Sequence, residues 1–247
     1  MEIRINRFLS DAGFCSRRAA DRLIEEGRVT VNGRRALLGE KTNEIDKVCV
    51  DGIPVIPVKK NILIAFNKPV GIVCTATDKQ GKNNVVYHLG LKDRVYPIGR
   101  LDKDSEGLLL LTNNGDITYK MLRAGGGHEK EYIVETDKEI TDDFIKKMSA
   151  GIFLKDLNKK TAGCKVRPVY KKNAGTTKVF SIVLIQGLNR QIRRMCEACG
   201  YKVRKLKRVR IMNIKLGKLP VGEYRELTDR EYDELIIKLN SEGQNGR

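Results

Sequence analysis

The chain has 247 residues, with 48 lysines and arginines against 31 aspartates and glutamates, and a formal charge of +17. This length allows one large domain or a medium and a small one, and the excess of cations favours a polyanionic partner over a merely solvated basic surface. No apolar run approaches the roughly 20 residues of a membrane span, and the N-terminus has no signal-peptide pattern. We therefore expect a cytoplasmic protein without a membrane partner.

The first fifty residues predict a small module of two helices and a hairpin. Apolar residues recur at helical spacing over residues 5–12, and a second helix is expected over 16–26, with Ser16 as its N-cap. The Asn32-Gly33 pair that follows is a strong hairpin signal. Three cations lie mostly off the apolar stripe of the second helix: Arg17, Arg18 and Arg22.

A domain over 1–48, a linker over 49–61, a second domain over 62–239 and a disordered tail over 240–247 are expected. The linker, or alternatively an edge segment, is suggested by Pro54 and Pro57 in an extended run. The expected strands of the second domain are 62–66, 108–112, 130–136 and 179–186. Its expected helices are 116–123, 142–150, 190–198 and 229–239.

Three carboxylates precede four leucines in the stretch GRLDKDSEGLLLLTNNG, residues 99–115: Asp102, Asp104 and Glu106. The leucines predict a strand buried on both faces. A loop held by such a strand is a common place for chemistry. The spacing leaves open a hard-cation site, an acid/base pair, one catalytic acid with two bystanders, or a solvated turn.

The expected helix over 190–198 has one apolar stripe, and the stripe contains both cysteines of a C-x-x-C pair, Cys196 and Cys199. These cysteines are expected to be buried packing groups. Arg193 lies nearest the stripe, so we expect it to be half-buried and to need a carboxylate partner. Arg190 and Arg194 are expected to contact phosphates or to form a solvated face.

Two further stretches have alternative interpretations. Basic and apolar residues interleave over 201–211, which suits a phosphate-tracking surface or else a charged edge strand. Tyr132 lies inside the expected strand 130–136, where it can be a core residue or a platform for a base.

Taken together, these motifs resemble pseudouridine synthases of the RsuA, RluB, RluE and RluF type, which modify ribosomal RNA. NKPVG (67–71), the acidic stretch, KEYIV (130–134) and GLNRQIRRM (187–195) occur in the family's order. The first residues are similar to the αL RNA-binding motif of ribosomal protein S-four. The resemblance implies an α+β chain, with a small N-terminal αL RNA-binding domain before a catalytic domain built on a mixed or antiparallel sheet.

The resemblance also implies roles for single residues. Asp102 matches the essential nucleophilic or basic carboxylate, Tyr132 the tyrosine that stacks on the target base, and Arg193 the arginine that pairs with the aspartate. Asp104 and Glu106 match no catalytic position, so we expect them to shape the loop or hold neighbouring cations. This mismatch removes the hard-cation site, so no metal is implied, and no cofactor is implied because the isomerisation involves no redox change. Whether the aspartate attacks the sugar, attacks the base or removes a sugar proton stays open.

The implied reaction converts a flipped-out uridine of ribosomal RNA into pseudouridine. The closest resemblance is to F-type enzymes, which act on 23S RNA; tRNA is a further possible substrate, and a monomer is expected. The remaining expected substrate or RNA contacts are Lys68, Pro69, Arg100, Leu101, Arg190, Arg194, Leu206, Arg17, Arg18 and Arg22. Among these, Lys68 and Pro69 match a motif that supports the catalytic loop, and Leu206 an apolar residue near the base. Competing hypotheses are a non-catalytic RNA-binding or ribosome-assembly factor and a metal-dependent nuclease.

Overall fold

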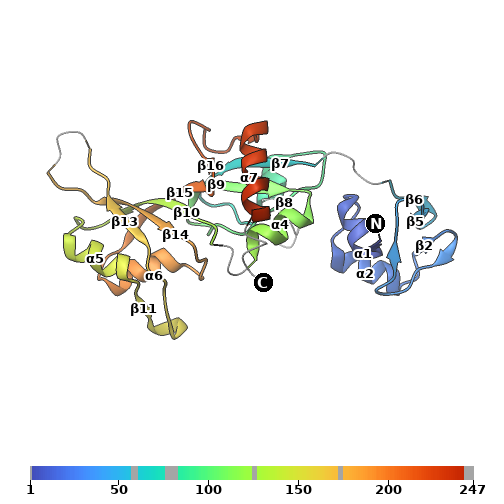
Figure 1. Cartoon of the computed structure of the whole chain (residues 1–247), viewed down its shortest axis with the longest axis horizontal. Coiled ribbons are helices and arrows are strands. Elements are labelled where there is room, and N and C mark those ends of the chain that lie inside the picture. Colours follow the sequence, from blue (N-terminus) through green and yellow to red (C-terminus); the bar gives the residue numbers. More distant parts are fainter. Residues whose placement is uncertain (1, 57–60, 76–82, 124–126, 172–174, 242–247) are drawn as a thin grey trace.

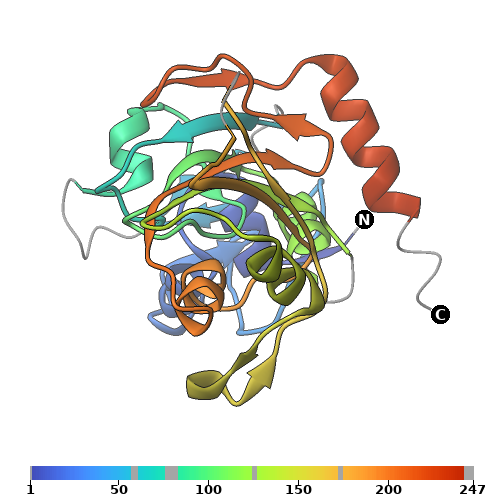
Figure 2. The ribbon, with the colours of Figure 1, turned by 90° about the vertical axis from the view of Figure 1, so that its left-hand side faces the viewer.

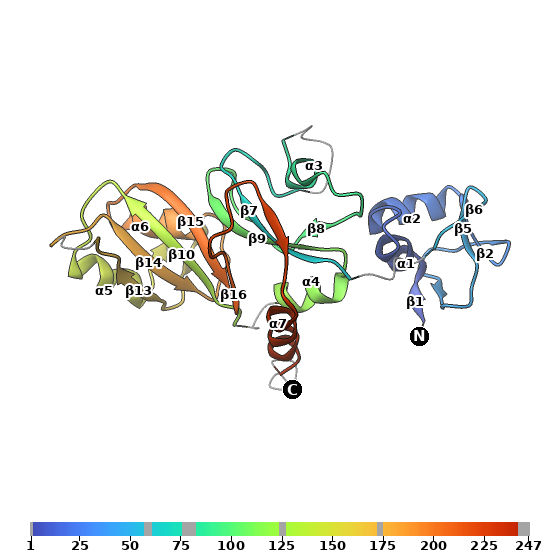
Figure 3. The ribbon, with the colours of Figure 1, turned by 90° about the horizontal axis from the view of Figure 1, so that it is seen from above.

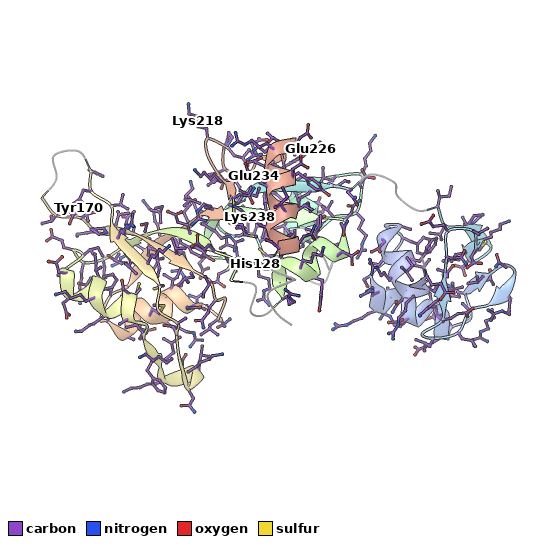
Figure 4. The ribbon with its side chains drawn as sticks, viewed as in Figure 1. His128, Tyr170, Lys218, Glu226, Glu234 and Lys238 are labelled. Atoms are coloured by element: carbon purple, nitrogen blue, oxygen red, sulfur yellow. The ribbon has the colours of Figure 1, made fainter. Side chains whose placement is uncertain are left out.

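The computed structural model describes residues 2–56, 61–75, 83–123, 127–171 and 175–241. An N-terminal module is followed by a larger domain built on a long sheet (Figure 1). Tyr170, which follows the strand β13 (Lys165–Pro168), lies at the end of the larger domain far from the module, whereas Glu234 and Lys238 lie near the middle of the molecule (Figure 4). Within the described ranges, no helix has the length and apolarity of a membrane span.

The N-terminal module packs two helices, α1 (Ile5–Asp11) and α2 (Arg17–Glu25), against short strands. As expected, Ser16 caps α2, its hydroxyl accepting from the Ala19 N–H at 3.2 Å. The hairpin turn is also confirmed, since Asn32 and Gly33 both have positive φ. The strands are β1 (Ile3–Arg4), β2 (Val29–Val31), β3 (Arg34–Arg35), β4 (Lys41–Thr42), β5 (Val48–Val50) and β6 (Ile53–Pro54).

The module extends beyond residue 48, the boundary expected from the sequence. Strand β5 pairs with β2, β6 pairs with β5, and Val55 packs against the module's core. Pro54 lies in β6 at the edge of this sheet, where a residue without an N–H is tolerated. The proline signal therefore marks an edge strand, and much of the expected linker 49–61 belongs to the module. Of the expected tail, residues 242–247 lie outside the described residues.

The second domain has a nine-stranded sheet with the order β13-β14-β10-β15-β9-β7-β17, with β16 on β15 and β8 on β9. Its other strands are β7 (Leu63–Lys68), β8 (Tyr96–Pro97), β9 (Glu106–Thr112), β10 (Lys130–Thr136), β14 (Val179–Leu184), β15 (Val203–Ile211), β16 (Ile214–Lys215) and β17 (Tyr224–Glu226). A small hairpin, β11 (Phe153–Leu154) and β12 (Lys159–Lys160), encloses the 3-10 turn η2 (Lys155–Leu157). All strand pairs in the large sheet are antiparallel except β15 with β9. The sheet is mixed, as expected.

The parallel pairing of β15 with β9 is a seam between two half-sheets with separate cores. The helices are α3 (Val85–Leu89), α4 (Gly115–Leu122), α5 (Asp142–Ala150), α6 (Gln191–Ala198) and α7 (Asp229–Ser241). Helices α5 and α6 cover one face of β10, β14 and β15 (Figure 2). Around β7 and β9, α4 and α7 lie on one face and α3 on the other (Figure 3). The four leucines of β9 divide between these two faces, which confirms a strand buried on both sides.

Most expected elements of this domain occur within a few residues of their predicted bounds, and β10 and α5 match them fully. The basic stretch over 201–211 does form a strand, but its interpretation as an edge strand is wrong. Strand β15 lies between β10 and β9 in the middle of the sheet. Helix α3 escaped prediction because it is only five residues long.

The module contacts the second domain through two described side-chain bonds. Arg7 on α1 forms an ion pair of 2.5 Å with Asp116 on α4. Arg94 donates to the Cys15 carbonyl at 2.8 Å. The helices of the module therefore face the α4 end of the second domain.

Candidate active site

Asp102 lies half-exposed in the loop that enters β9, next to the seam. The loop turns tightly, because the Ser105 N–H donates to the Asp102 carbonyl at 3.1 Å. The segment after β7 fastens it from one side: Cys74 bonds to both the N–H and the carbonyl of Leu101, and Gly71 donates to the Lys103 carbonyl at 2.8 Å. The carboxylate is therefore held on a rigid base and remains open to solvent.

Lys68, the last residue of β7, holds the segment 69–74 in place by hydrogen bonds to its main chain. Its side chain is fully buried, and its ammonium donates to the carbonyls of Pro69 and Ile72 at 2.8 Å each. Burial lowers the pKa of Lys68, and the nearby Asp102 acts against that effect. The expectation of an RNA contact at Lys68 is corrected, since a fully buried group cannot reach RNA. Its expected support of the catalytic loop agrees with these bonds.

Gly107 allows β9 to approach β15 closely at the seam. It lies opposite Lys68 on β7 and opposite Arg208 on β15. Its φ is +110°, and a Cβ here would lie 2.3 Å from the Arg208 carbonyl oxygen. Any side chain at this position would force the two half-sheets apart.

Arg193 approaches the Asp102 loop from α6. It is half-buried, and its Nη2 donates to the Asp104 carbonyl at 2.9 Å. Burial is the main influence lowering its pKa and Arg190 adds to it, whereas Asp104 and Asp102 oppose them. In the part of the chain that the structure describes, no ion pair within 4.0 Å joins Arg193 to Asp102. The guanidinium therefore holds the main chain of the loop instead of the expected direct pair.

The two other acids, Asp104 in the loop and Glu106 at the start of β9, form ion pairs with nearby cations. Asp104 forms an ion pair with Arg190 at 3.3 Å, and Glu106 one with Lys207 at 3.2 Å. This confirms the expectation that they hold neighbouring basic residues. Arg190 is exposed at the start of α6 and has a left-handed backbone with φ 49°. Its charge is at least partly used within the molecule.

Arg194 is also bonded within the chain, although the sequence suggested a phosphate contact. It pairs with Asp156 in η2, and its Nε donates to the Asn189 carbonyl at 2.9 Å. Cys196 on α6 is fully buried, and Cys199 just after the helix is partly buried against the same core, so both pack as expected. Burial raises the pKa of Cys196 to about 12.

Tyr132 lies on β10 directly opposite Arg208 on β15, one strand away from the seam. It is half-buried and packs on the core beneath α6, so part of its side chain stays accessible. Leu206 belongs to the same core and is only 6% exposed. Leu206 lies opposite Val134 on β10, in the strand next to that of Tyr132, and its expected place near the base stays a prediction. Arg100 is exposed and Leu101 is buried at the start of the loop.

Arg208 is the site residue that sequence reasoning missed. The basic stretch was interpreted as a surface, yet Arg208 is only 3% exposed. The available signal was its spacing: residues two apart on a strand share a face, so Arg208 lies on the face of the buried Leu206.

The arginines of α2, unlike the buried Arg208, lie at the surface. Arg17, Arg18 and Arg22 are all exposed. None of the three has an acidic partner within 4.0 Å among residues 2–56 and the other described ranges. Their charges are available to a polyanion.

Comparison with known proteins agrees with both parts of the chain. Residues 62–198 match the model of the RNA pseudouridylate synthase family, and residues 3–41 match the S4 domain. The matched range contains Asp102, Tyr132 and Arg193. The chain belongs to the RNA pseudouridylate synthase family and is therefore an isomerase that acts on RNA.

Two curated relatives and one solved structure show which members of the family this chain resembles. The chain is 52% identical to the dual-specificity RNA pseudouridine synthase RluF of Escherichia coli, over 95% of this chain and 77% of the relative. It is 35% identical to the ribosomal large subunit pseudouridine synthase B of Bacillus subtilis, over 94% and 95% of the two chains. A crystal structure of a pseudouridylate synthase shares the fold, with a TM-score of 0.67 and 24% identity over 94% of this chain and 99% of that one.

Proposed function

We propose that this enzyme converts a specific uridine of 23S ribosomal RNA into pseudouridine, with Asp102 as the reacting carboxylate. The observation that carries the proposal is the fastening of the Asp102 loop from both sides. The segment after β7 bonds to Leu101 and Lys103, and Arg193 of α6 bonds to the Asp104 carbonyl. The large-subunit target is supported by the name of the Bacillus subtilis relative, a ribosomal large subunit pseudouridine synthase. The term dual-specificity in the name of the Escherichia coli relative supports a second RNA, for which tRNA is the candidate.

The arrangement suits an isomerisation. The N1–C1′ bond of the nucleoside breaks, a C5–C1′ bond forms, C5 loses a proton and N1 gains one, so nothing is oxidised or reduced. A uridine in folded RNA must flip out of its stack before it can reach the half-exposed Asp102. The accessible part of Tyr132 can replace the lost stacking, which is worth about 1–3 kcal/mol per base.

The N-terminal module supplies affinity in this proposal. Its exposed arginines on α2 have no acidic partners among the described residues, so each can contact a phosphate and release counterions. The enzyme would work as a monomer in the cytoplasm, where it meets ribosomal RNA.

The first prediction tests Asp102. Tritium release from 23S transcripts that contain 5-tritiated uridine reports the loss of the C5 proton. We expect Asp102→Asn to lower the single-turnover rate by at least about 10³-fold, because the reacting group is lost. Binding of the same transcript should change less than about threefold, since the charges that bind phosphate remain. Asp104→Asn is the matched control, with a rate within about fivefold because the main-chain bonds of the loop persist.

Three outcomes would contradict the proposal. Undiminished tritium release by Asp102→Asn would remove the carboxylate from the mechanism. Loss of activity in EDTA, or cleavage of the transcript, would indicate a metal-dependent nuclease. Normal ribosomes in cells that carry only Asp102→Asn, with no missing pseudouridine in 23S RNA or tRNA, would favour a non-catalytic assembly factor.

A further inference from the structure

We propose that Arg208 is a positioning residue that holds the Asp102 loop and the Tyr132 strand in one catalytic geometry. The proposal rests on the proposed function, in which these two residues act on the same uridine. It concerns a buried side chain that forms no ion pair with any described residue.

The guanidinium of Arg208 bonds to the main chain on both sides of Asp102. Its Nε donates to the Leu108 carbonyl at 2.6 Å, and its Nη1 donates to the Arg100 carbonyl at 3.3 Å. One planar, rigid group therefore joins the start of the catalytic loop to the strand that follows it. A lysine, with a single nitrogen on a flexible stem, could not occupy both positions in the same way.

We call these two hydrogen bonds of Arg208, to the Leu108 and Arg100 carbonyls, the Arg208 clamp. The strand pairing explains why the clamp is needed. Strands β15 and β9 are paired over only two residue pairs, Lys207 with Glu106 and Arg208 with Gly107. Arg208 also lies directly opposite Tyr132 on β10. So short a parallel ladder provides few main-chain hydrogen bonds between the half-sheet with Asp102 and the half-sheet with Tyr132. The Arg208 side chain adds two bonds across this seam.

The electrostatic setting favours a role in function over one in stability. Burying a guanidinium against carbonyls, with no carboxylate partner, costs free energy. Its Nη2 is buried without a hydrogen-bond partner in the described part of the chain. Burial lowers the pKa of both Lys68 and Lys130, and Arg208 lowers each further, so three cations lie close together. An apolar residue would suit this interior better if only stability mattered.

Arg210, two residues along the same strand, provides a matched control. Its guanidinium pairs with Glu131 at 2.8 Å and with Glu129 at 2.9 Å. It makes no described bond to the Asp102 loop. Removing it takes a guanidinium from β15 without touching the clamp.

The test compares Arg208→Met, Arg208→Lys and Arg210→Met in the full chain. For each we would measure the single-turnover tritium-release rate, the transcript Kd, the melting temperature and backbone amide hydrogen exchange. We expect the rate to fall about 100-fold in Arg208→Met and about tenfold in Arg208→Lys, because small displacements of reacting groups are costly. Kd should stay within about threefold in both, and Arg210→Met should retain a rate within about threefold of the unaltered enzyme. Exchange should rise over residues 100–108 in the Arg208 variants and not in Arg210→Met.

Two results would overturn the proposal: a rate within threefold of the unaltered enzyme in Arg208→Lys and Arg208→Met, or a rate loss matched by weaker binding with unchanged exchange in the loop. If Arg208→Met does not fold, Arg208→Lys decides, since it keeps the buried charge. Failure of the proposed function is distinguishable, because the unaltered enzyme would then release no tritium from 23S transcripts while the exchange measurement would still report on the clamp.

Discussion

Helices α2 and α6 both begin beside clustered arginines, yet the two clusters serve different purposes. On α2, Arg17 and Arg18 point to solvent without acidic partners among the described residues. At α6, Arg193 and Arg194 bond to carbonyls and an acid of the same chain. The net charge of a basic protein therefore combines cations available to RNA with cations that hold its own loops, and only their partners distinguish the two groups.

The sharpest test of this difference is Arg193→Met. It removes the α6 bond to the Asp104 carbonyl and leaves the bonds from the β7 side. We expect the single-turnover rate to fall about 100-fold, because the loop can move by the order of 1 Å, with Kd within about threefold. Quenched-flow tritium release and filter binding measure the two quantities. A loss of affinity with an unchanged rate would place Arg193 among the RNA contacts instead.

The complementary test replaces Arg17, Arg18 and Arg22 together by glutamine. We expect Kd to weaken about tenfold at physiological salt, and the slope of log K against log salt to fall by about 2 to 3, roughly one for each lost phosphate contact. The rate at saturating RNA should stay unchanged. Arg28→Gln is the control, since Arg28 is already paired with Asp51 at 2.6 Å. An unchanged slope in the triple variant would assign the phosphate contacts to the catalytic domain.

The smallest expected effect belongs to Arg194→Gln. Its pair with Asp156 ties α6 to the β11–β12 hairpin at the surface. Urea unfolding should show a loss of less than about 1 kcal/mol, as is usual for partly exposed ion pairs. Tritium release should stay within about twofold. A large loss of RNA affinity would show that Arg194 belongs with the arginines of α2.

The spacing of apolar residues predicted most helices and strands of the second domain. The residues whose roles or surroundings could not be predicted each have a physical reason. The uninterrupted leucines of β9 and the aromatic and β-branched residues at the centre of β10 left little choice of structure. Pro54 left a linker and an edge segment open, because a proline is tolerated in both, and the structure has the edge strand. Asp102 could be separated from Asp104 and Glu106 only through the family resemblance, since three acids in one loop look alike by spacing. The spacing placed Arg208 on the face of Leu206, but its burial also depends on a parallel pairing with β9, which is far away in the sequence.

Gly107 has a consequence for how the chain can vary. Its φ of +110° and the 2.3 Å contact that any Cβ would make with the Arg208 carbonyl leave one acceptable amino acid at this position. A library that samples all twenty residues at 107 should return glycine alone among active clones, whereas exposed Lys103, four residues earlier, should accept many. The catalytic loop therefore tolerates substitution at Lys103 but not at Gly107, where the two half-sheets meet.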